Sequence, residues 1–161
     1  MTDEPVRAGV TLSAPAPHAF AVFAERIGEW WPRPYTYSQD ELARIAIDPA
    51  GRRWYEVDRR GRRIDWGEVR AFEPPRRLLL TWAVGADRRP EPLERASEVE
   101  ISFLPAGPQT TRVELEHRRF DRHGAGAEVL RRGLASPEGW PFILTAYARA
   151  ASPTARAALC A

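Results

Sequence analysis

Alternation of apolar and polar residues predicts that much of this chain is β-strand. The clearest case lies late in the chain, where Val99, Ile101 and Phe103 share one side and glutamate or serine residues occupy the other. Val113 and Leu115 repeat the pattern one hairpin later. Six to seven short strands are expected, within the ranges 6–12, 43–48, 52–58, 63–72, 78–84, 97–104 and 111–118. Strands with one polar face favour a single antiparallel sheet.

In the segment after the first strand, apolar residues recur at helical spacing. Ser13 is a candidate helix cap, and Phe20, Phe23 and Ile27 recur on one side of the segment after it. A double tryptophan and Pro32 end this segment. We expect two short helices here.

A longer helix is predicted over residues 136–150. Ser136 is expected to cap it, with Pro137 in the first position, where no amide donor is needed. Its apolar stripe contains Trp140, Ile143 or Leu144, Tyr147 and Ala151. A weaker helical segment is expected at 124–132. One amphipathic helix against one face of an antiparallel sheet makes an α+β fold.

Length and charge indicate one domain without an affinity for nucleic acid. The 161 residues are typical of a single core, which we expect over about residues 6–150, with a C-terminal tail at 152–161. The 24 basic residues, all arginine, face 22 acidic residues, so the formal net charge is only +2. Because the two signs are interleaved, no nucleic-acid partner is expected.

The sequence favours a cytoplasmic location. No apolar run approaches the roughly 20 residues of a membrane span. The N-terminal segment from Met1 to Pro5 is acidic and lacks the features of a signal peptide. Cys160 is the sole cysteine, so no disulfide within the chain is expected. Whether the chain forms a homodimer stays open.

Motifs for metal, cofactor or covalent chemistry are missing from the sequence. His18, His117, His123 and Cys160 show no spacing typical of metal ligands. There is no nucleophile elbow and no phosphate-binding loop. We therefore expect neither a metal nor a cofactor.

An ordered series of short motifs resembles the SRPBCC (START/birch-pollen-allergen-like) superfamily. The series starts with the early helix that ends in Trp30-Trp31-Pro32 and continues through Trp66-Gly67-Glu68-Val69, Pro74-Pro75-Arg76-Arg77-Leu78, Thr81-Trp82, Ser97-Glu98-Val99, Thr111-Arg112-Val113, His117-Arg118-Arg119-Phe120 and Gly139-Trp140. Within the superfamily, the chain is most similar to small bacterial proteins resembling the C-terminal domain of the activator of the ninety-kilodalton heat-shock chaperone's ATPase (AHSA-type proteins).

The resemblance implies a helix-grip fold with an internal cavity. In this fold a curved sheet wraps around a long C-terminal helix, and a ligand cavity lies between them. The residues expected to line the cavity are Trp30, Trp31, Trp66, Trp82, Phe103, His117, Trp140 and Tyr147. The alternative is that these large side chains only fill the core. Because Trp30 and Trp31 are adjacent, we expect one of them at the pocket mouth or at an interface.

Two ionisable residues are weak candidates for acid–base catalysis. His117 shares a face with Val113 and Leu115, so a neutral imidazole there is placed to bind a ligand or pass a proton. A structural histidine is the alternative. Glu68 shares its parity with Trp66, although Gly67 permits a bulge that would reverse its direction. A solvated glutamate is the alternative there.

Three functions are compatible with these observations. The first is binding of an apolar or aromatic small molecule in the cavity. The second is a cyclase or dehydratase activity that uses His117 or Glu68 as acid–base. The third is a co-chaperone-like module related to stress, although the helix-grip pattern occupies nearly all 161 residues and leaves no second chaperone-binding domain. A fold shared by so many activities does not select among them.

Overall fold

The computed structural model describes residues 4–152. Cys160 and most of the predicted tail lie outside this range. Seven strands form one sheet in the order β1-β7-β6-β5-β4-β3-β2, and every neighbouring pair is antiparallel. Their bounds are β1 Val6–Leu12, β2 Leu42–Asp48, β3 Arg53–Asp58, β4 Arg63–Glu73, β5 Arg77–Trp82, β6 Ser97–Gly107 and β7 Thr110–Arg118. The predicted antiparallel sheet is confirmed.

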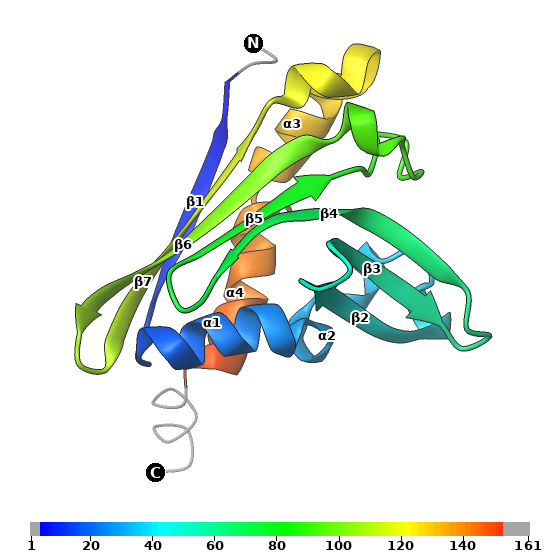
Figure 1. Ribbon diagram of the computed structural model, residues 1–161. Coiled ribbons are helices and arrows are strands. Elements are labelled where there is room, and N and C mark those ends of the chain that lie inside the picture. The colour runs from blue at the N-terminus through cyan, green and yellow to red at the C-terminus, as the bar shows by residue number, and fades with distance from the viewer. Residues whose placement is uncertain (1–3, 153–161) are drawn as a thin grey trace.

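The helices lie inside and at the ends of the curled sheet. They are α1 Ala16–Glu25, α2 Ile27–Trp30, α3 Ala127–Ala135 and α4 Trp140–Ala151. Short 3-10 turns are η1 Arg33–Tyr35, η2 Gln39–Glu41, η3 Leu93–Arg95 and η4 Phe120–Gly126. Figure 1 shows the sheet curling around α4, with α1 and α2 near one end of that helix and α3 leading into the other. This is the α+β helix-grip arrangement that the sequence predicts.

The inner face of the sheet carries the residues that alternation assigns to it. Val99, Ile101, Phe103 and Val113 are fully buried, and Leu115 is buried to within 2%. Strand pairing places Ile101 beside Leu115 and Phe103 beside Val113, so these side chains form one apolar layer against α1.

The long C-terminal helix starts later than predicted. Ser136 does not cap α4: its hydroxyl donates to the Gly133 carbonyl oxygen at 2.7 Å, at the end of α3. A turn through Pro137 to Gly139 separates the two helices, and α4 begins at Trp140. At Gly139 a Cβ atom would lie 2.2 Å from the carbonyl oxygen of Leu134, so only glycine allows the chain to turn this closely.

Two smaller helix predictions are also corrected. The N-cap of α1 is Pro15 rather than Ser13, and Pro15 makes no side-chain hydrogen bond to cap the helix. The segment expected at 124–132 forms α3 three residues further along, and it runs through Gly133 without a break. Within residues 4–152, no helix combines the length and apolar character needed to cross a membrane.

Candidate functional site

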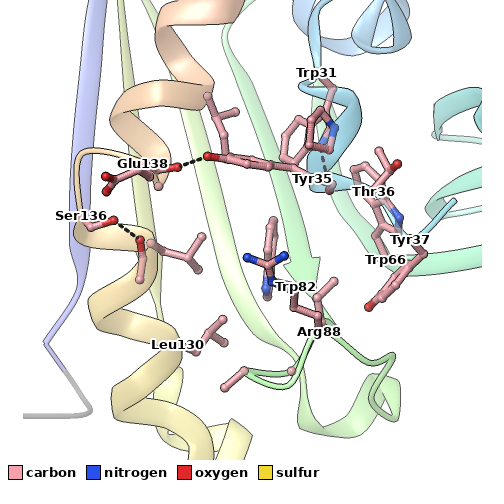
Figure 2. A pocket seen from close by; sticks show the side chains of 18 of the residues that line it. Trp31, Tyr35, Thr36, Tyr37, Trp66, Trp82, Arg88, Leu130, Ser136 and Glu138 are labelled. Atoms are coloured by element: carbon pink, nitrogen blue, oxygen red, sulfur yellow. Dashed lines mark hydrogen bonds between the residues drawn. The ribbon is translucent and has the colours of Figure 1, made fainter. Parts of the chain in front are cut away.

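A pocket of about 530 Å³ opens between the middle of the sheet and the α3–α4 corner. Strands β3, β4 and β5 supply one wall, the segment from Trp31 to Gln39 the second, and α3 with the start of α4 the third. Figure 2 shows Trp31, Trp66 and Trp82 on one side of this space, with Leu130 and Ser136 across from them. The residues come from distant parts of the sequence, so the pocket exists only in the folded chain.

Three tryptophans form a continuous aromatic wall of the pocket. The Trp31 ring centroid lies 5.1 Å from that of Trp66 and 6.4 Å from that of Trp82. The indole N–H of Trp66 donates to Glu56 at 2.8 Å, which holds its ring in place. Trp54 lies behind the wall and packs edge-on against both Trp31 and Trp66. The rings of the wall are tilted against one another, by 48° between Trp31 and Trp66 and by 41° between Trp31 and Trp82, so they offer both faces and edges to an aromatic ring.

Both members of the double tryptophan are buried, whereas the sequence predicts one of them at the pocket mouth or at an interface. Trp30 is 6% exposed and Trp31 is 5% exposed. Trp30 is the last residue of α2, whereas Trp31 has extended backbone angles of φ −61° and ψ 131°. Because the helix ends between them, their side chains leave in different directions and both reach the interior. Trp31 lines the pocket from its inner side, and Trp30 packs below it.

The other five predicted cavity residues lie in the core and not at this pocket. Trp30, Phe103 and Tyr147 pack around Phe23, with ring centroids 5.0 to 5.9 Å from it. Trp140 and His117 lie behind Trp82, at 5.4 and 5.5 Å between centroids. None of the five is among the residues that line the pocket. The space beneath α4 that the resemblance suggested is filled by aromatic rings.

Glu56 on β3 is a buried carboxylate at the pocket, and the sequence analysis missed it. It is fully buried, and it accepts hydrogen bonds from the backbone N–H groups of Tyr37 and Ser38 at 2.8 and 2.7 Å. With the Trp66 indole it has three donors. Glu56 thus fastens the loop after α2 onto the sheet. Its alternation with Trp54 was the available signal, because the register shift leaves Trp66 of β4 as the extra residue and β3 keeps its parity.

Glu68, the predicted glutamate, lies away from the pocket. Its carboxylate forms ion pairs with Arg53 at 3.6 Å and Arg70 at 3.2 Å, and 29% of its side chain is exposed. Gly67 pairs with Trp54 at a register shift, which is the bulge that the sequence allowed for. The structure supports the solvated-glutamate alternative for this position.

His117 belongs to a buried chain of hydrogen bonds. The Trp140 indole N–H donates to its Nδ1 at 3.0 Å, so a neutral His117 carries its proton on Nε2 and donates to Ser97 Oγ at 2.7 Å. The Ser97 hydroxyl then donates to His123 Nε2 at 2.7 Å, and His123 Nδ1 donates to Glu91 at 2.5 Å. Burial, and next the nearby His123, hold the pKa of His117 well below its usual range.

This hydrogen-bonded chain ties together the elements behind the pocket. It joins the hairpin before β6, the end of β7, η4 and the first residue of α4. Both ring nitrogens of His117 are occupied, and the residue is fully buried. The geometry therefore supports a structural role for His117 and gives it no route to a molecule in the pocket.

Comparison with known proteins identifies the family. A model of the family described as "Activator of Hsp90 ATPase homolog 1-like protein" matches residues 13–146. The chain belongs to this family. A search of curated proteins found no match. The resemblance to AHSA-type SRPBCC proteins that the motifs indicate is thus confirmed.

Solved structures of similar proteins share this fold. The anthrahydroquino-gamma-pyrone synthase Txn09, solved in complex with SUM, is 35% identical, with a TM-score of 0.63 over 92% of this chain and 98% of that one. CalC from Micromonospora echinospora, a self-sacrificing resistance protein, is 31% identical, with a TM-score of 0.64 over 92% and 94%. Protein MLL2253 from Mesorhizobium loti, 22% identical with a TM-score of 0.63 over 91% and 95%, shares the fold.

For this AHSA1-like protein the motif series identified the aromatic wall but not its polar partners. Trp31, Trp66 and Trp82 stand in quoted motifs, and all three line the pocket. Tyr37 and Glu56 lie in segments without a recognised motif, because only the tertiary contact between loop and sheet brings them together. Among residues 4–152, no group of three metal-ligating side chains is close enough to hold an ion.

Proposed function

We propose that this protein binds a planar aromatic small molecule in the pocket between its sheet and the α3–α4 corner. The observation that carries the proposal is the wall of Trp31, Trp66 and Trp82 along a cavity of about 530 Å³. Ligand pockets of about 300–1,000 Å³ typically combine such apolar walls with a few polar groups. Offset or edge-on contacts with indole rings favour a flat, conjugated ligand.

The names of two relatives support this choice of ligand. Txn09 is named as the synthase of an anthrahydroquino-gamma-pyrone, a fused aromatic compound, and it is 35% identical to this chain. CalC, at 31% identity, is named as a resistance protein. The synthase name concerns a small molecule, and neither name concerns a chaperone, which favours a ligand-binding role over the co-chaperone-like role considered from the sequence.

Filling the pocket from α3 tests the proposal without disturbing the core. Gly133 lines the pocket, and a Cβ atom added there meets no atom within 4 Å. We expect Gly133→Phe to fold normally, because a helical glycine costs about 0.5–1 kcal/mol relative to alanine. It should weaken binding of a planar probe, such as 1,8-dihydroxyanthraquinone, by roughly tenfold or more, measured by calorimetric titration and thermal shift.

Ala135→Phe is the matched control for this experiment. Ala135 is exposed on the same helix and does not line the pocket, so the added ring should leave probe affinity unchanged. Equal affinity in the wild type and both variants would place the binding site elsewhere. A wild-type protein that binds no planar aromatic probe would end the proposal.

Catalysis on the bound molecule is a second candidate, favoured by the synthase name of Txn09. The acid–base groups that line this pocket include Tyr37, Glu56 and Glu138, whereas the predicted His117 and Glu68 do not line it. Mass spectrometry of hydroxylated aromatic probes after incubation with the protein tests this candidate. A product of changed mass supports catalysis, whereas probes that bind and are recovered unchanged support binding alone.

A further inference from the structure

Two buried polar atoms at the pocket have no hydrogen-bond partner. Among residues 4–152, the buried side-chain atoms without a partner are Tyr37 Oη, Ser38 Oγ and Trp82 Nε1. Tyr37 and Trp82 both line the pocket, and they do so from different walls, the loop after α2 and strand β5. Buried polar groups are normally paired, because leaving one unpaired costs about 1–3 kcal/mol.

The neighbouring polar groups of the same pocket are satisfied. The Tyr35 hydroxyl donates to the Glu138 carbonyl oxygen at 2.7 Å, a bond visible in Figure 2. The Trp31 indole donates to the Tyr35 carbonyl oxygen at 3.3 Å, and the Trp66 indole donates to Glu56 at 2.8 Å. Within residues 4–152, Tyr37 and Trp82 are therefore the pocket-lining residues with an unpaired buried polar atom, and the lack of a partner is not a general property of the pocket.

The chemistry of the two atoms limits what can pair with them. An indole N–H only donates, so Trp82 needs an acceptor such as a carbonyl or phenol oxygen. The Tyr37 ring extends in Figure 2 from its loop toward the hairpin that carries Arg88. Burial, followed by the charges of Glu56, Asp87 and Glu91, raises the pKa of Tyr37. Its hydroxyl therefore keeps its proton and can donate as well as accept.

We propose that the Tyr37 hydroxyl and the Trp82 indole N–H determine ligand specificity by hydrogen-bonding to oxygen substituents of the planar aromatic ligand. This inference rests on the proposed binding function and names the substituents that the pocket selects. Neither atom is open to solvent, so the ligand must displace the groups that cover them as it enters. Tyr37 is half-buried on an irregular loop, which allows that adjustment.

Tyr37→Phe separates recognition from stability, since it removes only the hydroxyl. We expect the affinity for 1,8-dihydroxyanthraquinone to fall roughly tenfold, in line with the loss of one buried hydrogen bond. The affinity for anthracene, which has the same three fused rings without oxygen, should stay within about twofold. The melting temperature of the free protein should stay equal or rise, because an unpaired polar group is removed.

Tyr35→Phe is the matched control in the same pocket. Its hydroxyl already has a partner in the free protein, so its removal should lower the melting temperature and change the affinities for both probes by the same factor. Trp82→Phe also removes part of the aromatic wall, so it should lower the affinities for both probes, and that for 1,8-dihydroxyanthraquinone more than that for anthracene.

The outcomes distinguish this inference from the function on which it rests. If both probes bind and Tyr37→Phe leaves the ratio of their affinities unchanged, the inference is wrong while aromatic binding stands. If Tyr37→Phe destabilises the free protein as Tyr35→Phe does, the hydroxyl has an internal partner and the inference is also wrong. If neither probe binds the wild type, both the binding function and the inference are overturned.

Discussion

Glu56 supports the inner end of the pocket through three neutral donors. Its carboxylate receives two backbone N–H groups from the loop after α2 and the indole N–H of Trp66. This one side chain therefore determines where that loop lies and how the aromatic wall is oriented. Burial of a carboxylate at such a point is favourable only because all these donors converge on it.

Glu56→Gln is expected to destabilise the protein, although the glutamine side chain has nearly the same shape as glutamate. The amide oxygen can replace one carboxylate oxygen, but the amide NH₂ then faces an N–H donor of the loop or the indole. We expect the free energy of unfolding to fall by about 1–3 kcal/mol, measured by denaturant titration.

Glu68→Gln is the control for Glu56→Gln. Its partly exposed ion pairs with Arg53 and Arg70 should contribute less than about 1 kcal/mol. If both substitutions lower the free energy of unfolding by the same amount, the three donors on Glu56 contribute no more stability than the partly exposed ion pairs of Glu68.

At the scale of elements, β4 and β5 meet closely at Gly67. The carbonyl oxygen of Thr81 accepts the Trp54 indole N–H at 2.7 Å, and a Cβ atom on Gly67 would lie 1.9 Å from that oxygen. The Thr81 hydroxyl accepts the Glu68 N–H at 2.7 Å in the same place. The crossing therefore depends on the absence of a side chain at position 67.

Gly67→Ala should lower the free energy of unfolding by more than about 2 kcal/mol, because backbone atoms must separate to admit the methyl group. Gly133→Ala is the comparison, since its Cβ atom meets open space in α3 and should stabilise by about 0.5–1 kcal/mol. Thermal unfolding of the two variants shows whether Gly67→Ala destabilises the protein and Gly133→Ala stabilises it. A Gly67→Ala protein as stable as the wild type would show that the two strands are free to move apart.

At the scale of the whole molecule, the buried hydrogen-bonded chain through His117 makes stability depend on pH. The lowered pKa of His117 means that the folded protein keeps this ring neutral where the unfolded chain, with a value near 6.5, takes up a proton. Below about pH 6.5 the unfolded state therefore binds more protons, and stability falls as pH falls.

We expect a loss of about 1.4 kcal/mol per pH unit from this group between roughly pH 6 and pH 5, a range above the titration of most carboxylates. His117→Gln should reduce the pH dependence of unfolding by that amount, while lowering stability at pH 7 through the bonds lost to Ser97 and Trp140. Chemical denaturation at several pH values measures the slope. An unchanged slope in the variant would contradict the neutral state of His117.

The sequence by itself determined the antiparallel sheet, the approximate ranges of its strands and the family. Alternation at Val99, Ile101 and Phe103 is a local signal with period two, and a strand expresses it directly. The sequence also indicated the residues of the aromatic wall, because Trp31, Trp66 and Trp82 stand in recognisable motifs. The sequence did not show which aromatic residues line the pocket and which fill the core. Phe103, Trp140 and Tyr147 are large aromatic residues like the three wall tryptophans, and they differ from them only in what covers them.

Only the tertiary structure decided the position and the polar groups of the pocket. Ser136 followed by Pro137 has the local pattern of a helix start, but the close turn at Gly139 moves the start of α4 to Trp140 and opens the corner where the pocket lies. Glu56 and Tyr37 are 19 residues apart, and their contact depends on a loop folding back onto β3. Contacts of this kind leave no periodic trace in the sequence, because each depends on the three-dimensional path of another segment.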